Sequence, residues 1–286
     1  MIRVGTRGSA LALAQARLVA SRIGDNAELV VISTAGDKSA RPIRELGDGA
    51  FVAALEDALR RGEVDVAVHS LKDVPTAETG DLVIAAIPVR EDPRDVLVTS
   101  TRAGLASLPH GALVGTSSPR RAAFLRSARP DVVVAEIRGN VETRLRKVQA
   151  GEFDATILAL AGLRRLGLPF ADDEVLPTSV MLPAPGQGAL AIQCRTDAHT
   201  LRGRLAALDD RATRVGVTAE RALLRSLGAS CELALGALAS IEGDLITLDA
   251  ALAADGGIAR FRGADRDPLE LAHRAADELG LVTRAR

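Results

Sequence analysis

The amino-acid sequence predicts an α/β protein with two α/β domains, whose sheets are mostly parallel, and a small C-terminal α+β domain with an antiparallel sheet. Three observations predict this class. Short apolar runs without polar alternation, such as VDVAV (64–68), are typical of strands buried on both faces. These runs alternate with amphipathic stretches of helical length. After about residue 211 the apolar runs are instead joined by short turns, EGD (242–244) and DGG (255–257), which are typical of hairpins.

The first domain begins with a strand and a well-marked helix. Ser9 is suited to cap the helix 10–23, and Gly24 is suited to end it. The polar, glycine-rich stretch 34–49 is predicted to be a loop. The other elements of this domain are strands at residues 2–6, 28–33, 64–68 and 82–86, and a helix at 50–61.

The second domain repeats the alternation after the charged stretch REDPRD (90–95), which we interpret as a crossover. Ser118 is predicted to begin one helix and Asn140 another. The stretch MLPAPGQGALAIQC (181–194) is predicted to return the chain to the first domain through one strand. The remaining elements are strands at 95–99, 112–116, 131–136 and 154–160, and a helix that ends at Leu166.

The third domain is predicted to contain a long helix, TRVGVTAERALLRSL (213–227), three strands and a final helix. Asp267 is suited to cap the final helix, with Pro268 at its first position and Gly280 at its end. The predicted domain boundaries are 1–90 with 188–207 for domain 1, 91–187 for domain 2 and 208–286 for domain 3.

Composition excludes several classes of protein. The net charge is −1, and the chain has five Phe but neither Trp nor Tyr, so a nucleic-acid partner is not expected. No run reaches the length of a membrane span and no signal peptide is visible, so we expect a cytoplasmic protein with no membrane partner. Its two cysteines, Cys194 and Cys231, are expected to be reduced. The four scattered histidines argue against a metal site.

Five loops at predicted strand ends share one chemistry. Each is rich in Arg, Ser, Thr or Lys, and each lies where a strand runs into a helix or a loop, which is where α/β sheets bind ligands. Helix N-termini and guanidinium groups there favour an anion with several charges. The loops are Thr6–Ser9, Ser33–Asp37, His69–Asp73, Gly115–Arg121 and Arg138–Asn140.

Two residues have alternative interpretations. Asp73, in HSLKDVP (69–75), is either a catalytic carboxylate or a turn residue with Lys72 as its surface partner. Cys231 is either a nucleophile in a loop or a small core residue, and Cys194, inside an apolar strand, is the better core candidate. If adjacent residues at a strand end point to opposite sides, Lys72 and Asp73 can serve different groups.

The sequence resembles the porphobilinogen deaminase (hydroxymethylbilane synthase) family over nearly its whole length. The resemblance rests on motifs in family order, among them GTRGSALALAQ, AVHSLKDVP, REDPRD, VGTSSPRR, IRGNVETRL and LPAPGQGALAIQCR. It implies two periplasmic-binding-protein-like α/β domains and a third domain that carries a cysteine-bound dipyrromethane. It also implies a transferase of tetrapyrrole and heme biosynthesis, which adds four porphobilinogen units to this primer, releases ammonia and yields hydroxymethylbilane. We expect a monomer.

The resemblance also assigns roles to residues. Cys231 would hold the dipyrromethane cofactor by a thioether, and Asp73 would be the catalytic carboxylate that protonates the leaving amine. The cofactor carboxylates would be bound by Lys72, Thr116, Ser118, Arg120, Arg121, Arg165 and Gln187. The substrate or growing chain would be bound by Arg7, Ser9, Arg138 and Arg144, with Phe51 in a lid.

An alternative from a different class of function would also explain the arginines. A non-enzymatic anion-binding or effector-sensing module on the same scaffold would need neither Asp73 nor Cys231. Such a module is expected to carry a signal peptide or a DNA-binding segment, and neither is visible. The mass of the purified protein separates the two hypotheses, because only the enzyme would carry a dipyrromethane.

Overall fold

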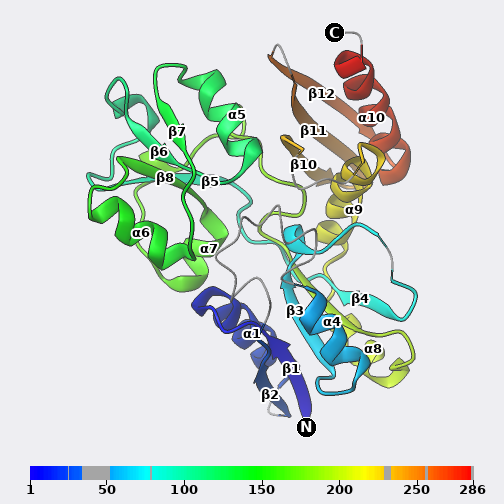
Figure 1. Cartoon of the computed structure of the whole chain (residues 1–286). Helices are drawn as coiled ribbons and strands as arrows, with labels where there is room; N and C mark the ends of the chain where they lie inside the picture. The colour runs from blue at the N-terminus through cyan, green and yellow to red at the C-terminus, as the bar shows by residue number, and fades with distance from the viewer. Residues whose placement is uncertain (25, 34–51, 78, 229–232, 255–256, 285–286) are drawn as a thin grey trace. The chain divides into compact units, whose positions relative to one another are not determined.

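The computed structural model describes the chain except for residues 25, 34–51, 78, 229–232, 255–256 and 285–286 and the side chains of 281–284. The described chain forms two compact units (Figure 1). The first unit contains Met1–Glu91 and Ala189–Val215, and the second contains Asp92–Gly188, Gly216–Gly228 and most of the C-terminal part. The described part of the first unit is therefore built from two separate stretches of sequence.

The first unit contains a sheet with the strand order β2-β1-β3-β9-β4. β1 pairs in parallel with β2 and β3, whereas β9 runs antiparallel to both β3 and β4. The return stretch thus inserts its strand between two strands of the N-terminal segment. The strands are β1 (Ile2–Thr6), β2 (Ala27–Val31), β3 (Val66–Ser70), β4 (Leu82–Ala86) and β9 (Leu190–Arg195).

Helices cover both faces of this sheet because alternate strand residues are apolar on each face. On one face, Val66, Val68 and Ile192 pack with residues of α1 (Ala10–Ile23) and α8 (His199–Leu205). On the other face, Ala67 packs with Leu55 and Leu59 of α4 (Ala53–Arg60). Ser9 caps α1 by accepting a hydrogen bond from the Ala12 N–H, and Gly24 at φ 102° ends it, as the sequence predicts.

The second unit contains a four-stranded sheet with the order β5-β8-β6-β7 among its described residues. β6 pairs in parallel with β7 and β8, and β5 runs antiparallel to β8. The strands are β5 (Asp95–Thr99), β6 (Leu113–Gly115), β7 (Val133–Ala135) and β8 (Ala155–Ala159). The helices are α5 (Pro119–Ala128), α6 (Val141–Gln149) and α7 (Leu160–Leu166). Ser118 and Asn140 cap α5 and α6, as predicted.

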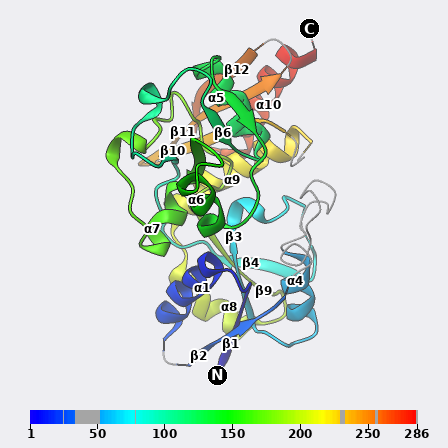
Figure 2. The same ribbon diagram turned by 60° about the vertical axis from the view of Figure 1, so that its left-hand side comes forward.

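The same unit holds an antiparallel sheet, which Figure 2 shows from a second side. Its order is β10-β11-β12, and its elements are β10 (Leu235–Glu242), β11 (Leu245–Ala254) and β12 (Gly257–Asp265). Phe124 of α5 and Ala251 of β11 belong to one buried apolar cluster. The helix α5 therefore contributes to the cores of both sheets in this unit.

The two remaining long helices are α9 (Arg211–Ser226) and α10 (Pro268–Arg284). The predicted end of α10 at Gly280 is wrong, because the helix continues to Arg284. Gly280 does not adopt the positive φ of a helix-ending glycine. No helix among the described residues is long and apolar enough to cross a membrane.

The sheets differ from a uniformly parallel arrangement. Parallel pairing links β2, β1 and β3 and links β7, β6 and β8, but β9 and β5 run antiparallel to their neighbours. The fold is thus α/β with mixed sheets and a separate antiparallel sheet. The division of the chain into three domains stays a prediction, since the antiparallel sheet lies in the same compact unit as the four-stranded sheet.

Candidate functional site: a buried arginine pair on one carboxylate

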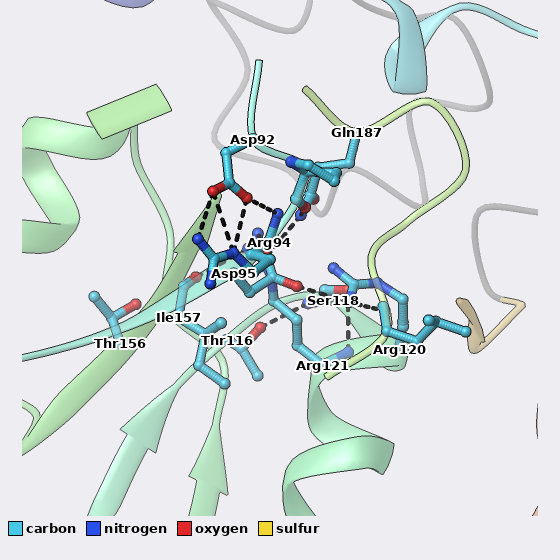
Figure 3. Close-up of polar contacts among 12 residues, drawn as sticks. Asp92, Arg94, Asp95, Thr116, Ser118, Arg120, Arg121, Thr156, Ile157 and Gln187 are labelled. Atoms are coloured by element: carbon cyan, nitrogen blue, oxygen red, sulfur yellow. Dashed lines mark hydrogen bonds and ion pairs between the residues drawn. The ribbon is translucent and has the colours of Figure 1, made fainter. Parts of the chain in front are cut away.

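The second unit buries two guanidinium groups against a single carboxylate (Figure 3). Asp95 is the first residue of β5 and is fully buried. Its Oδ2 accepts a hydrogen bond from Arg120 Nη1 at 2.8 Å, and its Oδ1 accepts from Arg121 Nε and Nη2 at 3.1 and 2.7 Å. Each arginine also donates to a main-chain carbonyl, that of Leu182 at 2.6 Å and that of Ile157 at 2.9 Å.

The start of α5 explains why both arginines reach Asp95. Ser118 is the N-cap, and its Oγ accepts from the Arg121 N–H at 3.4 Å. Pro119 fixes the first helical position, so Arg120 and Arg121 follow directly in the first turn. Thr116 lies at the end of β6, where its Oγ1 accepts from the Ser118 N–H at 3.2 Å.

The charges of this cluster do not balance. Burial acts to raise the pKa of Asp95, but the charges of Arg120 and Arg121 lower it well below its usual range, so it is ionised. One carboxylate then faces two guanidinium groups. Burial and the nearby charge of Arg121 lower the pKa of Arg144 to about 10, so Arg144 is still protonated at neutral pH and adds to the excess. A positive excess in a poorly solvated place favours the binding of an anion.

A glycine-rich loop holds the other side of Asp95. Gln187 Nε2 donates to Asp95 Oδ1 at 3.0 Å and to the Pro93 carbonyl at 2.7 Å. The flanking Gly186 and Gly188 have φ values of 72° and 88°, a region that other residues rarely adopt. The Gly188 carbonyl accepts from Arg165 Nη2 at 2.6 Å. The loop therefore carries Gln187 and is hydrogen-bonded to Arg165 of α7. Both residues are predicted cofactor ligands.

Of the predicted substrate ligands in this unit, neither hydrogen-bonds to Asp95. Arg138 is paired with Glu136 through hydrogen bonds of 3.0 and 2.9 Å. Arg144 Nε donates to the Gly139 carbonyl at 2.9 Å. Both arginines lie around the N-terminus of α6, which Asn140 caps. This helix start and the start of α5 are both termini whose dipole favours an anion.

In the first unit, Lys72 and Asp73 lie on a single turn of 3₁₀ helix, η1 (Leu71–Asp73), directly after β3. The expectation that they alternate like strand residues is therefore wrong, because successive residues of a 3₁₀ turn are about a third of a turn apart. Both side chains are exposed, whereas Leu71 is fully buried and anchors the turn. The Leu71 N–H donates to the Ala189 carbonyl at 3.0 Å.

The end of β1 carries the other predicted residues of this unit. Arg7 is partly buried, and Ser9 is the N-cap of α1. The charge of Arg7 reaches His69 in β3, so the ends of β1 and β3 are electrostatically linked. Cys231 and Phe51 lie outside the described residues, so their predicted roles stay predictions.

Sequence reasoning missed the buried polar residues Asp95 and Glu220, and it placed a third, His69, in a loop, although His69 lies within β3. Asp95 stands in the charged stretch that was interpreted as a crossover, although a lone acid at the first position of an apolar strand could have signalled a buried ion pair. Glu220 in α9 is fully buried and accepts from the Gly186 and Ala239 N–H groups at 2.7 and 2.9 Å. His69 pairs with Gln193 Oε1 at 3.0 Å inside the first unit.

Comparisons with known proteins cover nearly the whole chain. Residues 2–203 match the family model described as the dipyrromethane cofactor binding domain of porphobilinogen deaminase, and residues 215–281 match that of its C-terminal domain. A porphobilinogen deaminase of Acidothermus cellulolyticus is 50% identical over 292 residues, which cover 98% of this chain and 88% of that protein. One of Roseiflexus sp. is 46% identical, with 96% and 94% covered.

A solved structure with detectable similarity is the second substrate binding domain of a putative amino acid ABC transporter from Streptococcus pneumoniae. It is 12% identical, has a TM-score of 0.42, and the match covers 72% of this chain and 90% of that one.

Proposed function

Because the chain belongs to the porphobilinogen deaminase family, whose members are transferases that polymerise porphobilinogen into hydroxymethylbilane, we propose that it builds this product on a dipyrromethane held by a thioether at Cys231. Four units would be joined head-to-tail, with loss of ammonia at each addition. The substrate is a pyrrole that carries an acetate and a propionate, so the growing chain gains two carboxylates with every unit.

The unbalanced cluster around Asp95 is the observation that carries this proposal. Two buried guanidinium groups share one carboxylate, and the buried Nε of Arg120 has no hydrogen-bond partner among the described residues. An additional carboxylate would neutralise the cluster and satisfy that donor. A ligand with several carboxylates, such as a dipyrromethane, fits this requirement. A neutral ligand would leave the positive excess uncompensated.

We assign the cofactor carboxylates to the residues of this cluster and to Lys72 of the first unit. When bound, the dipyrromethane supplies the pyrrole position to which the first substrate is joined. The assigned residues are Lys72, Thr116, Ser118, Arg120, Arg121, Arg165 and Gln187. Arg7, Ser9, Arg138 and Arg144 are assigned to the substrate or growing chain, and Phe51 to a lid.

Asp73 is assigned the proton transfer. Its carboxyl group would donate a proton to the amine that leaves porphobilinogen, and the resulting carboxylate would stabilise the positive charge left on the pyrrole. Its place on a turn anchored by the buried Leu71 supports this role, since the turn presents an exposed carboxylate from a rigid base.

The mass of the intact purified chain tests the attachment. We expect it to exceed the sequence mass by one dipyrromethane, and we expect Cys231→Ser to abolish the increment while Cys194→Ser keeps it. Cys194 is the matched control because it is a buried core residue of β9. A wild-type chain without the increment and without turnover of porphobilinogen would instead favour a non-enzymatic anion-binding module.

We further propose a monomer in the cytoplasm that has no nucleic-acid partner. Gel filtration with light scattering checks the first point, since a stable dimer would elute at twice the mass of the chain. Fractionation of cells that express the tagged protein checks the second, and a DNA-binding titration at low salt checks the third.

A further inference from the structure

A buried chain of hydrogen bonds in the first unit links three elements. His69 of β3 is 5% exposed, and its Nε2 lies 3.0 Å from Gln193 Oε1 of β9. Gln193 Nε2 donates in turn to Oε1 of Glu56, in the first turn of α4, at 2.9 Å. Neither the assigned proton transfer nor the assigned ligands of the cofactor use these three residues.

The hydrogen bonds fix which nitrogen of His69 carries the proton. Arg60 Nη2 lies 3.7 Å from Glu56 Oε2, so Glu56 is paired as a carboxylate, which only accepts hydrogen bonds. Gln193 must therefore direct its NH2 group to Glu56 and its carbonyl oxygen to His69. That oxygen also only accepts, so the bond requires a proton on His69 Nε2. Burial lowers the pKa of His69 to about 4, so near neutral pH the ring is uncharged and Nδ1 carries no proton.

Arg7 approaches His69 from the strand on the other side of β3. In the sheet order, β3 lies between β1 and β9. Gly5 of β1 lies opposite Ala67 of β3, and this parallel register, continued by two residues, brings Arg7 to His69. The charge of Arg7 opposes protonation of His69 and so lowers its pKa further. The repulsion is mutual, so an imidazolium at His69 would push the Arg7 guanidinium away, whereas a neutral ring does not.

We propose that Glu56, acting through Gln193, holds His69 as the neutral Nε2–H tautomer, and that His69 in this form is a positioning residue for Arg7. The assignment of Arg7 to a substrate carboxylate rests on the proposed function, but the tautomer of His69 does not. His69 acts only through Arg7, because an uncharged ring leaves the neighbouring guanidinium directed to the substrate. Without the Glu56 acceptor the Gln193 amide can rotate, and the ring proton can move to Nδ1.

Nitrogen NMR of the imidazole rings tests the tautomer without a measurement of activity. The full chain is labelled with nitrogen-15 histidine, and the signal of His69 is the one that is missing from His69→Gln. We expect the shifts of a single neutral Nε2–H tautomer in the wild-type chain at neutral pH. Glu56→Gln should give a mixture of both tautomers, because an amide can donate or accept. Asp57→Asn is the matched control on the same helix, since Asp57 also pairs with Arg60, and it should keep the wild-type pattern.

Steady-state kinetics with porphobilinogen tests the link to Arg7. His69→Asn is too short to reach Gln193 and should raise KM about tenfold, with a change in kcat below about threefold. His69→Gln has an amide N–H in the place of Nε2 and should restore KM to within about twofold of the wild-type value. In a chain that already carries Arg7→Ala, His69→Asn should raise KM no further, because residues that act through one contact are not additive.

A proton on Nδ1 or a charged His69 ring in the wild-type chain at neutral pH would overturn the tautomer. Equal KM values for His69→Asn and His69→Gln, or full additivity of His69→Asn with Arg7→Ala, would overturn the role toward Arg7. Near-ultraviolet circular dichroism identifies variants that fail to fold. If His69→Asn is one of them, Glu56→Gln and Asp57→Asn decide, since only the first should raise KM. A wild-type chain that has the expected tautomer but no turnover would refute the proposed function alone.

Discussion

Gln187 donates a hydrogen bond to Asp95 at 3.0 Å, although the two residues are 92 positions apart in the sequence. This bond ties the loop that returns the chain to the first unit to the first residue of β5. The Asp95 carboxylate, which accepts hydrogen bonds from Arg120 and Arg121 of α5, is thus also held by the loop that contains Gln187. An amide is suited to this position, because it donates a hydrogen bond without adding another charge to the cluster.

Glu220 is expected to control the stability of the same loop. Replacement by Ala would leave the buried N–H group of Gly186 and the partly buried N–H group of Ala239 without their Glu220 acceptors, so the free energy of unfolding should fall by about 2–4 kcal/mol. Denaturant unfolding followed by circular dichroism measures this. Glu270→Ala, at an exposed position in the first turn of α10, is the control and should change the value by less than about 1 kcal/mol. If Glu220→Ala and Glu270→Ala lowered the free energy of unfolding equally, the two hydrogen bonds to Glu220 would contribute little to stability.

His69 should make the native state sensitive to acid. Burial lowers its pKa to about 4 from 6.5, against the opposing hydrogen bond with Gln193. Between these two values the unfolded chain binds a proton that the native chain does not, so the free energy of unfolding falls as the pH falls. The contribution of this group has a limiting slope of about 1.4 kcal/mol per pH unit.

The variant His69→Gln should lose this slope between pH 6.5 and pH 4, as measured by urea unfolding at several pH values. The exposed His199 provides the matched control, and His199→Gln should keep the wild-type slope. If His69→Gln retained the full slope, other groups would be responsible for the acid sensitivity.

Ser118 has two assigned roles that one substitution can separate. Ser118→Ala removes the cap of α5 and should cost about 1 kcal/mol of stability. Ser118→Asp keeps a capping oxygen and suits the helix dipole, so stability should be close to that of the wild type. Its negative charge would nevertheless repel a ligand carboxylate, so the fraction of chains that carry the mass increment should fall. Full loading of a stable Ser118→Asp chain would argue that Ser118 is only a cap.

Asp73→Ala should lower turnover of porphobilinogen by about a hundredfold or more, the range of a lost general acid. The side chain is exposed, so thermal stability should be almost unchanged. The mass increment at Cys231 should remain in chains that were loaded during expression. Asp81→Ala provides a control at another exposed acid of the first unit. Near-normal rates in Asp73→Ala would remove Asp73 from the mechanism.

Local signals in the sequence predict much of the fold because they act over a few residues. Ser9 and Gly24 mark α1 to the residue, and the apolar runs at β4 and β5 coincide with the strands. Gly280 misleads, because a glycine ends a helix only where the backbone turns to positive φ, and α10 continues past it. The 3₁₀ turn at Lys72 and Asp73 is likewise set by the packing of Leu71 and not by a local pattern.

The candidate site was predictable in its residue types but not in its connections. Arginines at the start of a predicted helix, here α5, indicate an anion-binding site. The acid that orients them is 25 and 26 residues away, and Gln187 comes from a still more distant segment. Sequence spacing cannot distinguish an arginine whose fork is occupied by an acid from one whose fork is not. That distinction depends on side-chain geometry within the folded unit.

The position of β9 between β3 and β4 has a consequence for synthesis of the chain. The ribosome makes β3 and β4 long before β9, so the two strands have no partner between them while the whole second sheet, β5 to β8, is being synthesised. Unpaired strand edges of this kind attract other chains. Premature stops or pauses before Leu190 should therefore produce nascent polypeptides that depend on chaperones to stay out of aggregates.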